Sequence, residues 1–269
     1  MAGYLPKPSF IAGINKAHPL SNGLVLALPI SENGGDVVYD KSGNINNGTK
    51  KGFTAWSGSA YGSALKFNQT GFSDRVDIPY NPLFRLRDNL TFCVTINYNI
   101  NPADDKNSYL IDSQNRYSFA IHRTGASNYL GFYSTTTGGS WLTGGPALVI
   151  NTTYNLALTY SKTDGKLHMY VNGALSASFD ISVSLASTTY GIRLGNYLNN
   201  YGGGAANWRY AGLIENVLIY NRTLSQSEIS IINQDPFVMY RTRRVSDWIG
   251  GALSAGATGN PWNYYAQMM

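Results

Sequence analysis

Residues 153–180 read TYNLALTYSKTDGKLHMYVNGALSASFD, and this stretch gives the strongest indication of the fold class. Bulky apolar residues occupy every second position from Tyr154 to Tyr160, which is the pattern of a strand that buries one face. The pairs Asp164-Gly165 and Asn172-Gly173 interrupt the apolar runs and can adopt the positive φ angles of tight hairpin turns. The stretch therefore predicts three consecutive antiparallel strands.

Similar apolar runs extend through most of the chain and are separated by turn residues at intervals of roughly 8–15 residues, as in a sandwich or barrel. They include GLVLALPI (23–30), LTFCVTINYN (90–99), YLGFYS (129–134), ALVI (147–150) and GLIENVLIYN (212–221). The composition agrees, because 20 Tyr and 29 Gly favour strands and turns, and helix-forming Glu is scarce. We predict an all-β, two-sheet antiparallel sandwich of the jelly-roll type over residues 20–235.

One short helix is expected after the last strand, in the segment TLSQSEISIINQ (223–234). Ser225 is placed as an N-cap, Glu228 lies three residues later as in a capping box, and apolar Ile residues follow. Pro236 ends this pattern, and no strand or helix period persists beyond it. Residues 236–269 are therefore expected to form a C-terminal arm, and residues 1–19 an N-terminal arm.

Positive charge concentrates in these two arms. Each has a net charge of +2, so that only +1 of the total of +5 remains for the 216 residues between them. A nearly neutral body is unlike a nucleic-acid-binding face, which concentrates basic residues on the folded surface. Because Arg and aromatic residues are enriched at protein interfaces, we expect the arms to attach the chain to other proteins or to its own copies. The interface candidates are Arg241, Arg243, Arg244, Trp248, Trp262, Tyr264 and Tyr265.

Three stretches of the chain are similar to a known family. They are LSNGLVLALPISENGGDVVYDKSGNINNGT (20–49), SALKFNQTGFSDRVDIP (63–79), and the pair KLHMYVNGAL (166–175) and YAGLIENVLIYNRTLSQSEI (210–229). In this order and spacing they resemble the laminin-G-like, concanavalin A-like lectin domains of bacterial and bacteriophage proteins. The resemblance implies a jelly-roll sandwich. The chain departs from the family around Glu215, because it has one acidic residue where the family commonly has two.

The two ends of the chain resemble the bacteriophage versions of this domain. The N-terminal segment is KPSFIAGINKAHPLSNGL (7–24), and the C-terminal segment is QDPFVMYRTRR (234–244). This likeness implies a non-catalytic structural or accessory virion protein, such as a capsid decoration or fibre-associated protein, assembled in the host bacterial cytoplasm with other virion proteins as partners. The start, MAGYLPKPSF, lacks the pattern of a secretory signal, and no run of about 18 apolar residues could span a bilayer. We therefore expect neither classical export nor membrane insertion.

A glycan-binding surface is a further expectation. Sugars stack on aromatic rings, and the segments TTTGGSWLTGG (135–145) and NYLNNYGGGAANWRY (196–210) place such rings on Gly- and Asn-rich loops. An alternative role for these aromatics is packing between loops or against neighbouring subunits. A carbohydrate-binding adhesion module for host-surface glycans, without a virion role, therefore stays open beside the virion protein. The glycan candidates are Trp141, Tyr197, Tyr201, Trp208 and Tyr210.

Catalytic and metal sites are not expected. Retaining glycoside hydrolases of the concanavalin-like fold use the motif ExDxxE, and none of Glu32, Glu215 and Glu228 lies in that pattern, so a hydrolase is the least favoured function. The three His and the single Cys93, which we expect to be buried, form no zinc pattern. Some family members hold calcium near the loop that follows the first strands, but Asp40 alone is not a carboxylate cluster. We predict a self-satisfied turn there and no cofactor.

Overall fold

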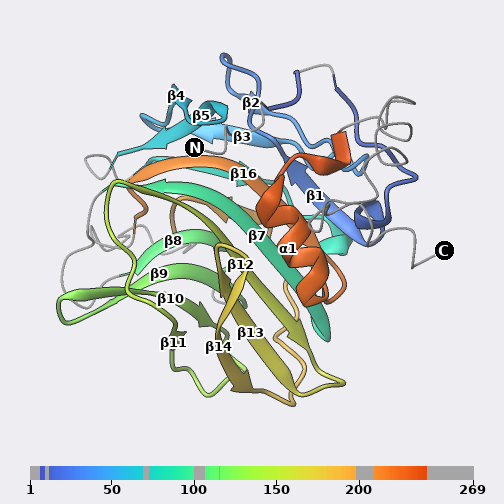
Figure 1. The fold of residues 1–269 in the computed structure, drawn as a ribbon, viewed down its shortest axis with the longest axis vertical. Coiled ribbons are helices and arrows are strands. Elements are labelled where there is room, and N and C mark those ends of the chain that lie inside the picture. The colour runs from blue at the N-terminus through green and yellow to red at the C-terminus, as the bar shows by residue number, and fades with distance from the viewer. Residues whose placement is uncertain are drawn as a thin grey trace, which may run out of the picture.

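The computed structural model describes residues 7–9, 12–68, 73–99, 107–114, 116–197 and 209–240. Two antiparallel sheets of eight strands each pack against one another around a common apolar core (Figure 1). This arrangement confirms the predicted all-β, two-sheet antiparallel sandwich.

In both sheets the order of the strands in space differs from their order in the chain. The first sheet consists of β14 (Ala174–Asp180), β13 (Lys166–Val171), β12 (Thr152–Ser161), β7 (Asn89–Tyr98), β16 (Gly212–Tyr220), β5 (Gly62–Phe67) and β4 (Ala55–Ser59), with β1 (Leu24–Leu28) also paired to β16. The second sheet consists of β11 (Leu142–Gly144), β10 (Ser127–Tyr133), β9 (Ser118–Thr124), β8 (Asn107–Asp112), β15 (Ile192–Leu194), β6 (Arg75–Ile78), β3 (Gly48–Lys51) and β2 (Val37–Val38). The helical segments are α1 (Gln226–Gln234) and the short 3-10 turns η1 (Pro19–Ser21), η2 (Pro82–Phe84) and η3 (Val238–Tyr240).

Period-two alternation positions the core between the sheets. Along β12, every second residue from Tyr154 to Tyr160 belongs to the main core, while Ala157 on the opposite face joins a separate apolar cluster. Phe92 of β7 meets Phe119 of β9 across the core, with ring centroids 6.1 Å apart. Each such fully buried side chain stabilises the fold by about 1.5–3 kcal/mol relative to an exposed one. The alternation read from the sequence is therefore confirmed.

Both predicted hairpins are present. The β13–β14 turn is formed by Asn172 and Gly173, whose φ angles of 51° and 78° are both positive, as a type I′ turn requires. The β12–β13 connection is longer, and there only Gly165, with a φ of 64°, has a positive angle. The positive angle expected from Asp164 is therefore not found.

The run 147–150 does not form the strand that its sequence suggests. Leu148 is buried in the main core, but Val149 is 62% exposed. The backbone amide of Leu148 donates to the carbonyl of Asn128, and the amide of Val149 donates to the hydroxyl of Tyr154. These isolated hydrogen bonds replace a strand ladder, so the segment anchors a loop through one apolar side chain.

Helix α1 begins at the predicted capping box. The hydroxyl of Ser225 accepts a hydrogen bond from the Glu228 amide at 3.2 Å, and the Glu228 carboxylate accepts one from the Ser225 amide at 2.9 Å. The same carboxylate pairs with the guanidinium of Arg222 at 2.7 Å. These contacts lower the pKa of Glu228 although burial opposes them. No helix within the described ranges is long and apolar enough to cross a bilayer.

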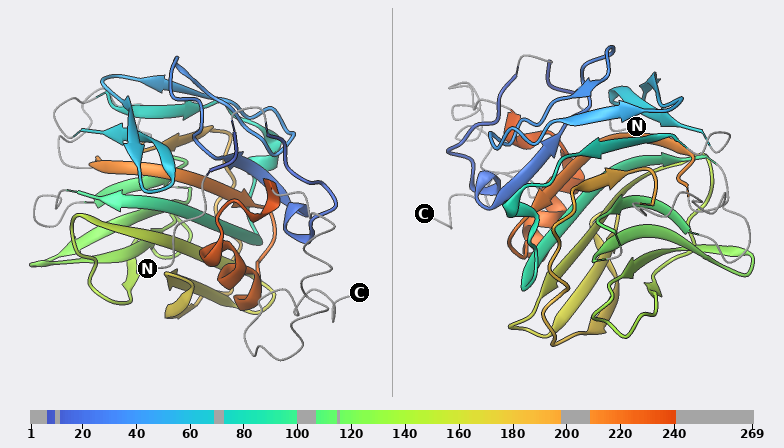
Figure 2. Two further views of the ribbon diagram at one scale, coloured as in Figure 1. Left: turned by 45° about the horizontal axis from the view of Figure 1, so that its top comes forward. Right: turned by 180° about the vertical axis from the view of Figure 1, so that it is seen from behind.

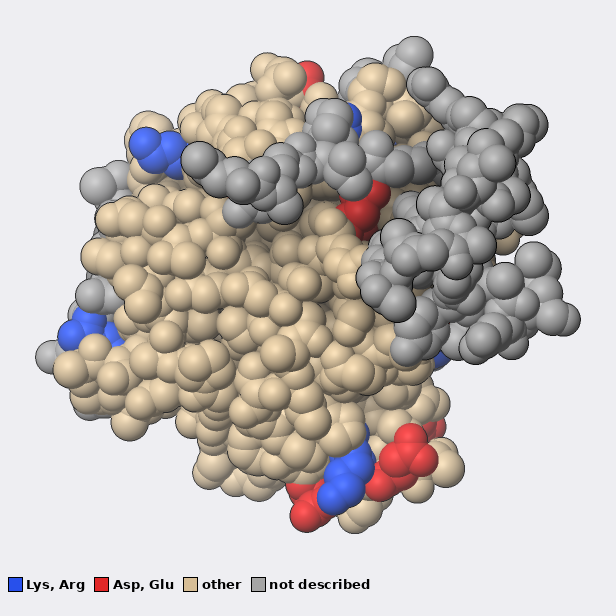
Figure 3. All heavy atoms as spheres, viewed as in Figure 1, with Lys and Arg blue, Asp and Glu red and all other residues tan. Residues whose placement is uncertain are grey.

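Helix α1 covers the outer face of the first sheet (Figure 2). Ile229 and Ile232 form an apolar cluster with residues of β7, β12 and β16, among them Cys93 and Leu218. The Cys93 thiol is free and buried, as predicted, and burial raises its pKa. The described residues on the face that Figure 3 shows, which includes α1, are mostly uncharged.

The described parts of both arms pack on the sandwich. Past Asp235, the side chains of Phe237 and Met239 are completely buried, and the Asn15 amide donates to the Met239 carbonyl at 2.8 Å. On the N-terminal side, the ammonium of Lys7 is enclosed among backbone carbonyls of the sandwich. Burial lowers the pKa of Lys7 to about 7, even though nearby carboxylates favour its charged form. The packed region therefore extends beyond residues 20–235 at both ends.

A chain ending after Asp235 is expected to be less stable than one ending after Tyr240. It lacks the buried side chains of Phe237 and Met239, whose burial together contributes at least about 3 kcal/mol. The measurement is the free energy of unfolding from urea titrations of the two chains. Equal values would show that residues 236–240 contribute nothing to the stability of the sandwich.

Candidate functional site

The structure separates the residues that the sequence nominated for glycan stacking. Trp141 and Tyr197 are half-buried and lie beside the second sheet. Tyr210 is fully buried, and its hydroxyl lies 2.8 Å from the carbonyl oxygen of Asn97 and 3.0 Å from that of Leu213. The nomination of Tyr210 as a surface residue is therefore wrong. It lies two residues before the closing strand β16, and its ring belongs to the main core.

The other nominated residues cannot be placed. The glycan candidates Tyr201 and Trp208, and the interface candidates Arg241, Arg243, Arg244, Trp248, Trp262, Tyr264 and Tyr265, lie outside the described residues.

Trp141 lies at the centre of a group of rings that we call the Trp141 cluster, made up of Tyr109, His122, Tyr133, Trp141 and Tyr197. The indole stacks on the imidazole of His122, with centroids 5.4 Å apart and an interplanar angle of 16°. It meets Tyr109 edge-on at 5.7 Å and Tyr133 at 5.5 Å, and Tyr109 in turn contacts Tyr197 at 5.1 Å. All members except Tyr109 keep part of their surface exposed.

A glycine in strand β10 makes room for the indole on the surface of the sheet. Gly131 of β10 pairs with Ala120 of β9 on one side and with Thr143 of β11 on the other. A Cβ atom at Gly131 would stand 3.1 Å from the ring atom Cε3 of Trp141 and 3.1 Å from Cβ of His122. The absence of a side chain at Gly131 therefore lets the indole pack directly on the sheet.

A break in strand register adds Tyr109 to the cluster. The pairing of β8 with β9 shifts between Tyr109 and Ile111, so β8 contains one residue more than its partner at this point. The consecutive residues Leu110 and Ile111 can then both face the main core. Tyr109, which precedes them in the chain, and Asp112, which follows them, are not part of that core. Such bulges commonly redirect side chains next to binding sites.

Two arginines and one carboxylate lie on β15 and β6, the two strands that follow β8 in the second sheet. Asp77 of β6 accepts a hydrogen bond from Nε of Arg193 through one oxygen and from Nε of Arg75 through the other, both at 2.8 Å. Nη1 of Arg193 also donates to the backbone carbonyl of Tyr197 at 2.9 Å. This contact fixes the backbone that presents the Tyr197 ring. One carboxylate shared by two guanidinium groups leaves a local excess of positive charge.

The cluster combines aromatic surface with directed polar groups. Partly exposed rings of Trp141, Tyr133 and Tyr197 offer apolar faces, and the His122 ring nitrogen Nδ1 is hydrogen-bonded to the side chain of Asn107. Aromatic contacts contribute about 0.5–1.5 kcal/mol each beyond the burial of their area. The arrangement can hold a ligand that has a flat apolar face and polar edges.

Sequence reasoning missed Tyr109, His122 and Tyr133 because it looked for aromatic residues on loops. In YLGFYS (129–134), period two puts Gly131 and Tyr133 on one face and the core residues Leu130 and Phe132 on the other. That pattern could have nominated Tyr133. The bulge in β8 left no comparable signal for Tyr109.

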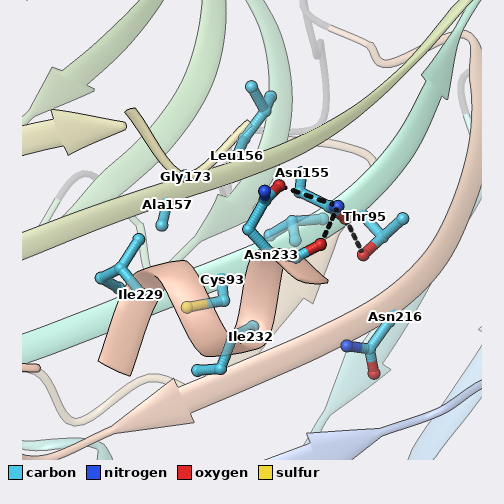
Figure 4. A pocket seen from close by; sticks show the side chains of 11 residues that line it. Cys93, Thr95, Asn155, Leu156, Ala157, Gly173, Asn216, Ile229, Ile232 and Asn233 are labelled. Atoms are coloured by element: carbon cyan, nitrogen blue, oxygen red, sulfur yellow. Dashed lines mark hydrogen bonds between the residues drawn. The ribbon is translucent and has the colours of Figure 1, made fainter. Parts of the chain in front are cut away.

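A small cavity lies on the opposite side of the molecule, between α1 and the first sheet (Figure 4). Its volume is about 20 Å³, which accommodates one water molecule and no sugar. Asn155 lines it and is hydrogen-bonded to Asn233 and Thr95, and Asn216 also lines it. The cavity is therefore a packing feature under the helix.

The loop around Asp40 is a self-satisfied turn, as predicted. The carboxylate of Asp40 accepts hydrogen bonds from the amides of Ala27, Ser42 and Asn46 at 2.8–2.9 Å, and from the Ser42 hydroxyl at 2.7 Å. Across the described ranges, no three His, Cys, Asp or Glu side chains gather as a metal site.

Comparison with known proteins identifies a family. The laminin G family model described as the concanavalin A-like lectin/glucanases superfamily matches residues 69–230. No curated protein matches the chain in sequence.

Several solved structures share the fold at low sequence identity. The binding domain of Paraclostridial Mosquitocidal Protein 1 has a TM-score of 0.62 and 14% identity over 80% of this chain and 52% of that one. Domain 4 of AbnA, a GH43 extracellular arabinanase from Geobacillus stearothermophilus, is in complex with arabinotriose. It has a TM-score of 0.59 and 16% identity over 78% of this chain and 98% of that one. A structure of botulinum neurotoxin type C, a toxin whose cell entry depends on two ganglioside molecules, has a TM-score of 0.61 and 16% identity over 86% of this chain and 54% of that one. The chain thus spans about half the length of the mosquitocidal and neurotoxin structures.

The substitution Gly131→Ala is expected to disturb the indole while the sandwich stays folded. The new methyl group would press on Trp141 and His122, at a cost of about 1–3 kcal/mol typical of overpacking. Near-ultraviolet circular dichroism should change, and the unfolding temperature should fall. Gly58→Ala is the matched control, because its Cβ would meet nothing nearer than 4.0 Å. Identical spectra and unfolding temperatures for the two variants would contradict the packing described for Trp141.

Proposed function

This chain belongs to the concanavalin A-like lectin/glucanases superfamily, and we propose that it is a non-catalytic glycan-binding module that uses the Trp141 cluster as its binding surface. The observation on which this depends is the indole of Trp141 lying on Gly131 of β10, beside the buried ring of Tyr109 and the partly exposed ring of Tyr133. The C–H faces of a pyranose or furanose ring pack well on such a surface, and polar side chains at its edge can meet the hydroxyl groups.

The similar structures support a carbohydrate ligand. The arabinanase domain is in complex with arabinotriose, and the neurotoxin's cell entry involves gangliosides. These ligands are known for the similar proteins, and identities of 14–16% show only that this chain shares their fold. They make a sugar the first ligand to test, either as an isolated oligosaccharide or as a host-surface glycan.

The non-catalytic part of the proposal is supported by the positions of the glutamates. Glu228 is engaged in the capping box of α1, and Glu215 is buried on β16. Glu32 accepts a hydrogen bond from the Tyr39 amide in the loop after β1. None of them lies in the Trp141 cluster, where a glycosidase would need two carboxyl groups beside the sugar.

Replacing Trp141 by Ala is expected to weaken glycan binding at least about tenfold, because the central stacking surface is lost. The protein would be screened on a glycan array, and the best ligand would then be titrated by calorimetry against the native chain and the variant. Phe53→Ala is the matched control, since Phe53 is an aromatic residue that is 72% exposed and lies on the β3–β4 turn.

Two outcomes would contradict this proposal. Equal affinities of the native chain and Trp141→Ala for the same glycan would place the binding surface elsewhere. Release of shorter sugars during incubation with the native chain, abolished by substitution of one Asp or Glu, would show that the protein is an enzyme.

We further propose that the module serves as an accessory component of a bacteriophage virion. This proposal is supported by the likeness of segments 7–24 and 234–244 to the corresponding segments of bacteriophage versions of the domain. The contact between Asn15 and Met239 brings the described parts of the two arms together, so they could engage a neighbouring subunit as one unit.

If the arms attach the protein to a particle, a chain ending after Tyr240 should fold but fail to co-sediment with assembled particles that retain the full chain. Sedimentation through a density gradient, followed by immunodetection, measures this. Normal incorporation of the shortened chain would remove the C-terminal arm from the proposed attachment.

A further inference from the structure

The outer face of the second sheet carries charged side chains beside the Trp141 cluster. On β15 and β6, the residues on either side of Arg193 and of Asp77 belong to the main core. Because side chains alternate along a strand, Arg193, Asp77 and Arg75 lie on the opposite, outer face. Gly131, on which the indole lies, alternates in the same way with core residues of β10. The aromatic and the charged groups therefore share one face of the sheet.

Each of the two arginines is held at two of its three side-chain nitrogens. Nε of Arg193 donates to one oxygen of Asp77 and Nε of Arg75 donates to the other, both at 2.8 Å. Their Nη1 atoms donate to the backbone carbonyls of Tyr197 and Ser73, respectively, both at 2.9 Å. In the part of the chain that the structure describes, no group accepts a hydrogen bond from Nη2 of either arginine, and both side chains are partly exposed. Both guanidinium groups are thus oriented while donors remain for a ligand.

Positive charge exceeds negative charge on this part of the face. Lys51 of β3 is exposed and lies opposite Arg75 in the pairing of β3 with β6. Together with Arg193, these cations adjoin the partly exposed carboxylate of Asp77. Asp112 of β8 lies opposite Arg193 on its other side, but it is 0% exposed, and its carboxylate accepts hydrogen bonds from a serine hydroxyl and a backbone amide. An anion that reaches this face therefore meets mainly cationic groups.

The charged groups and the Trp141 cluster are continuous with one another. The carbonyl that accepts from Arg193 belongs to Tyr197, whose ring contacts Tyr109, and Tyr109 contacts the indole. Strand pairing also places Tyr133 and Arg193 in one row across β10, β9, β8 and β15. They are three strands apart, which is roughly 14 Å at the usual strand spacing. One sugar ring does not cover that span, so a ligand that contacts both is an oligosaccharide.

We propose that Arg193 and Arg75 form a carboxylate subsite beside the Trp141 cluster, so that the glycan of this module is an acidic oligosaccharide. This inference rests on the proposed function, because the Trp141 cluster holds the neutral part of the ligand. A planar guanidinium matches the two oxygens of a carboxylate, and charge-assisted hydrogen bonds of this kind are stronger than neutral ones. Asp77 orients both guanidinium groups before a ligand arrives, so little side-chain freedom is lost on binding. A hexuronic acid unit carries a carboxylate of the required kind.

The test measures the preference of the native chain for a free carboxylate over its methyl ester. Oligosaccharides that contain hexuronic acids are arrayed in both forms, and the pair that binds best is titrated by calorimetry. Esterification keeps the sugar rings and removes the charge, so the native chain should bind the acid at least about tenfold more tightly than the ester. Arg75→Gln should lose most of this preference and keep its affinity for the ester. Arg193→Gln should also lose the preference, and it should weaken ester binding because Arg193 holds the Tyr197 backbone.

Lys166→Gln is the matched control. Lys166 pairs with Asp180 on the first sheet, so this variant removes one positive charge far from the proposed subsite and should keep the native preference. Equal binding of acid and ester by the native chain, or a preference that both arginine variants retain, overturns the acidic-ligand inference. If binding is then still lost in Trp141→Ala, the proposed function stands without it. Absence of binding to every glycan, neutral or acidic, contradicts the proposed function itself, and the inference falls with it.

Discussion

The burial of the central strands of the first sheet on both faces is the constraint from which the rest of this structure follows. Their inner face packs on the second sheet, and their outer face is covered by α1 and η3. The central strands β7, β12 and β16 are therefore almost entirely buried, whereas β10 alternates between buried and partly exposed residues. Because α1 occupies one outer face, the outer face of the second sheet is left for a ligand.

The Trp141 cluster uses that remaining face. A flat sheet surface offers little binding area by itself, so shape has to come from departures from regular strand geometry. Gly131 removes a side chain where the indole lies, and the bulge in β8 adds the ring of Tyr109. Arg193 holds the backbone of Tyr197 at the edge. Rings from separate segments thus form one surface on a rigid support, which favours binding because little side-chain freedom is lost.

The ends of the described chain are part of the sandwich and not appendages to it. Phe237 packs against Tyr61 with ring centroids 5.8 Å apart, and the Lys7 ammonium lies 5.7 Å from the Phe237 ring centroid. The N-terminal segment, η3 and strands β1, β5 and β16 therefore meet in one region. Any partner that displaced one end would disturb contacts of the other.

The all-β sandwich class, the β12–β13–β14 hairpins, the capped helix and the turn at Asp40 could be predicted from the amino-acid sequence, because their signals are local periodicity and residues close in the chain. The sequence could not separate buried Tyr210 from half-exposed Tyr197, since both flank the same Gly-rich segment and only strand pairing decides which ring enters the core. The grouping of Trp141 with His122 and the enclosure of Lys7 beside Glu215 join residues far apart in sequence. Only the tertiary structure decided these contacts, because the register of non-local strands, and not composition, brings such side chains together.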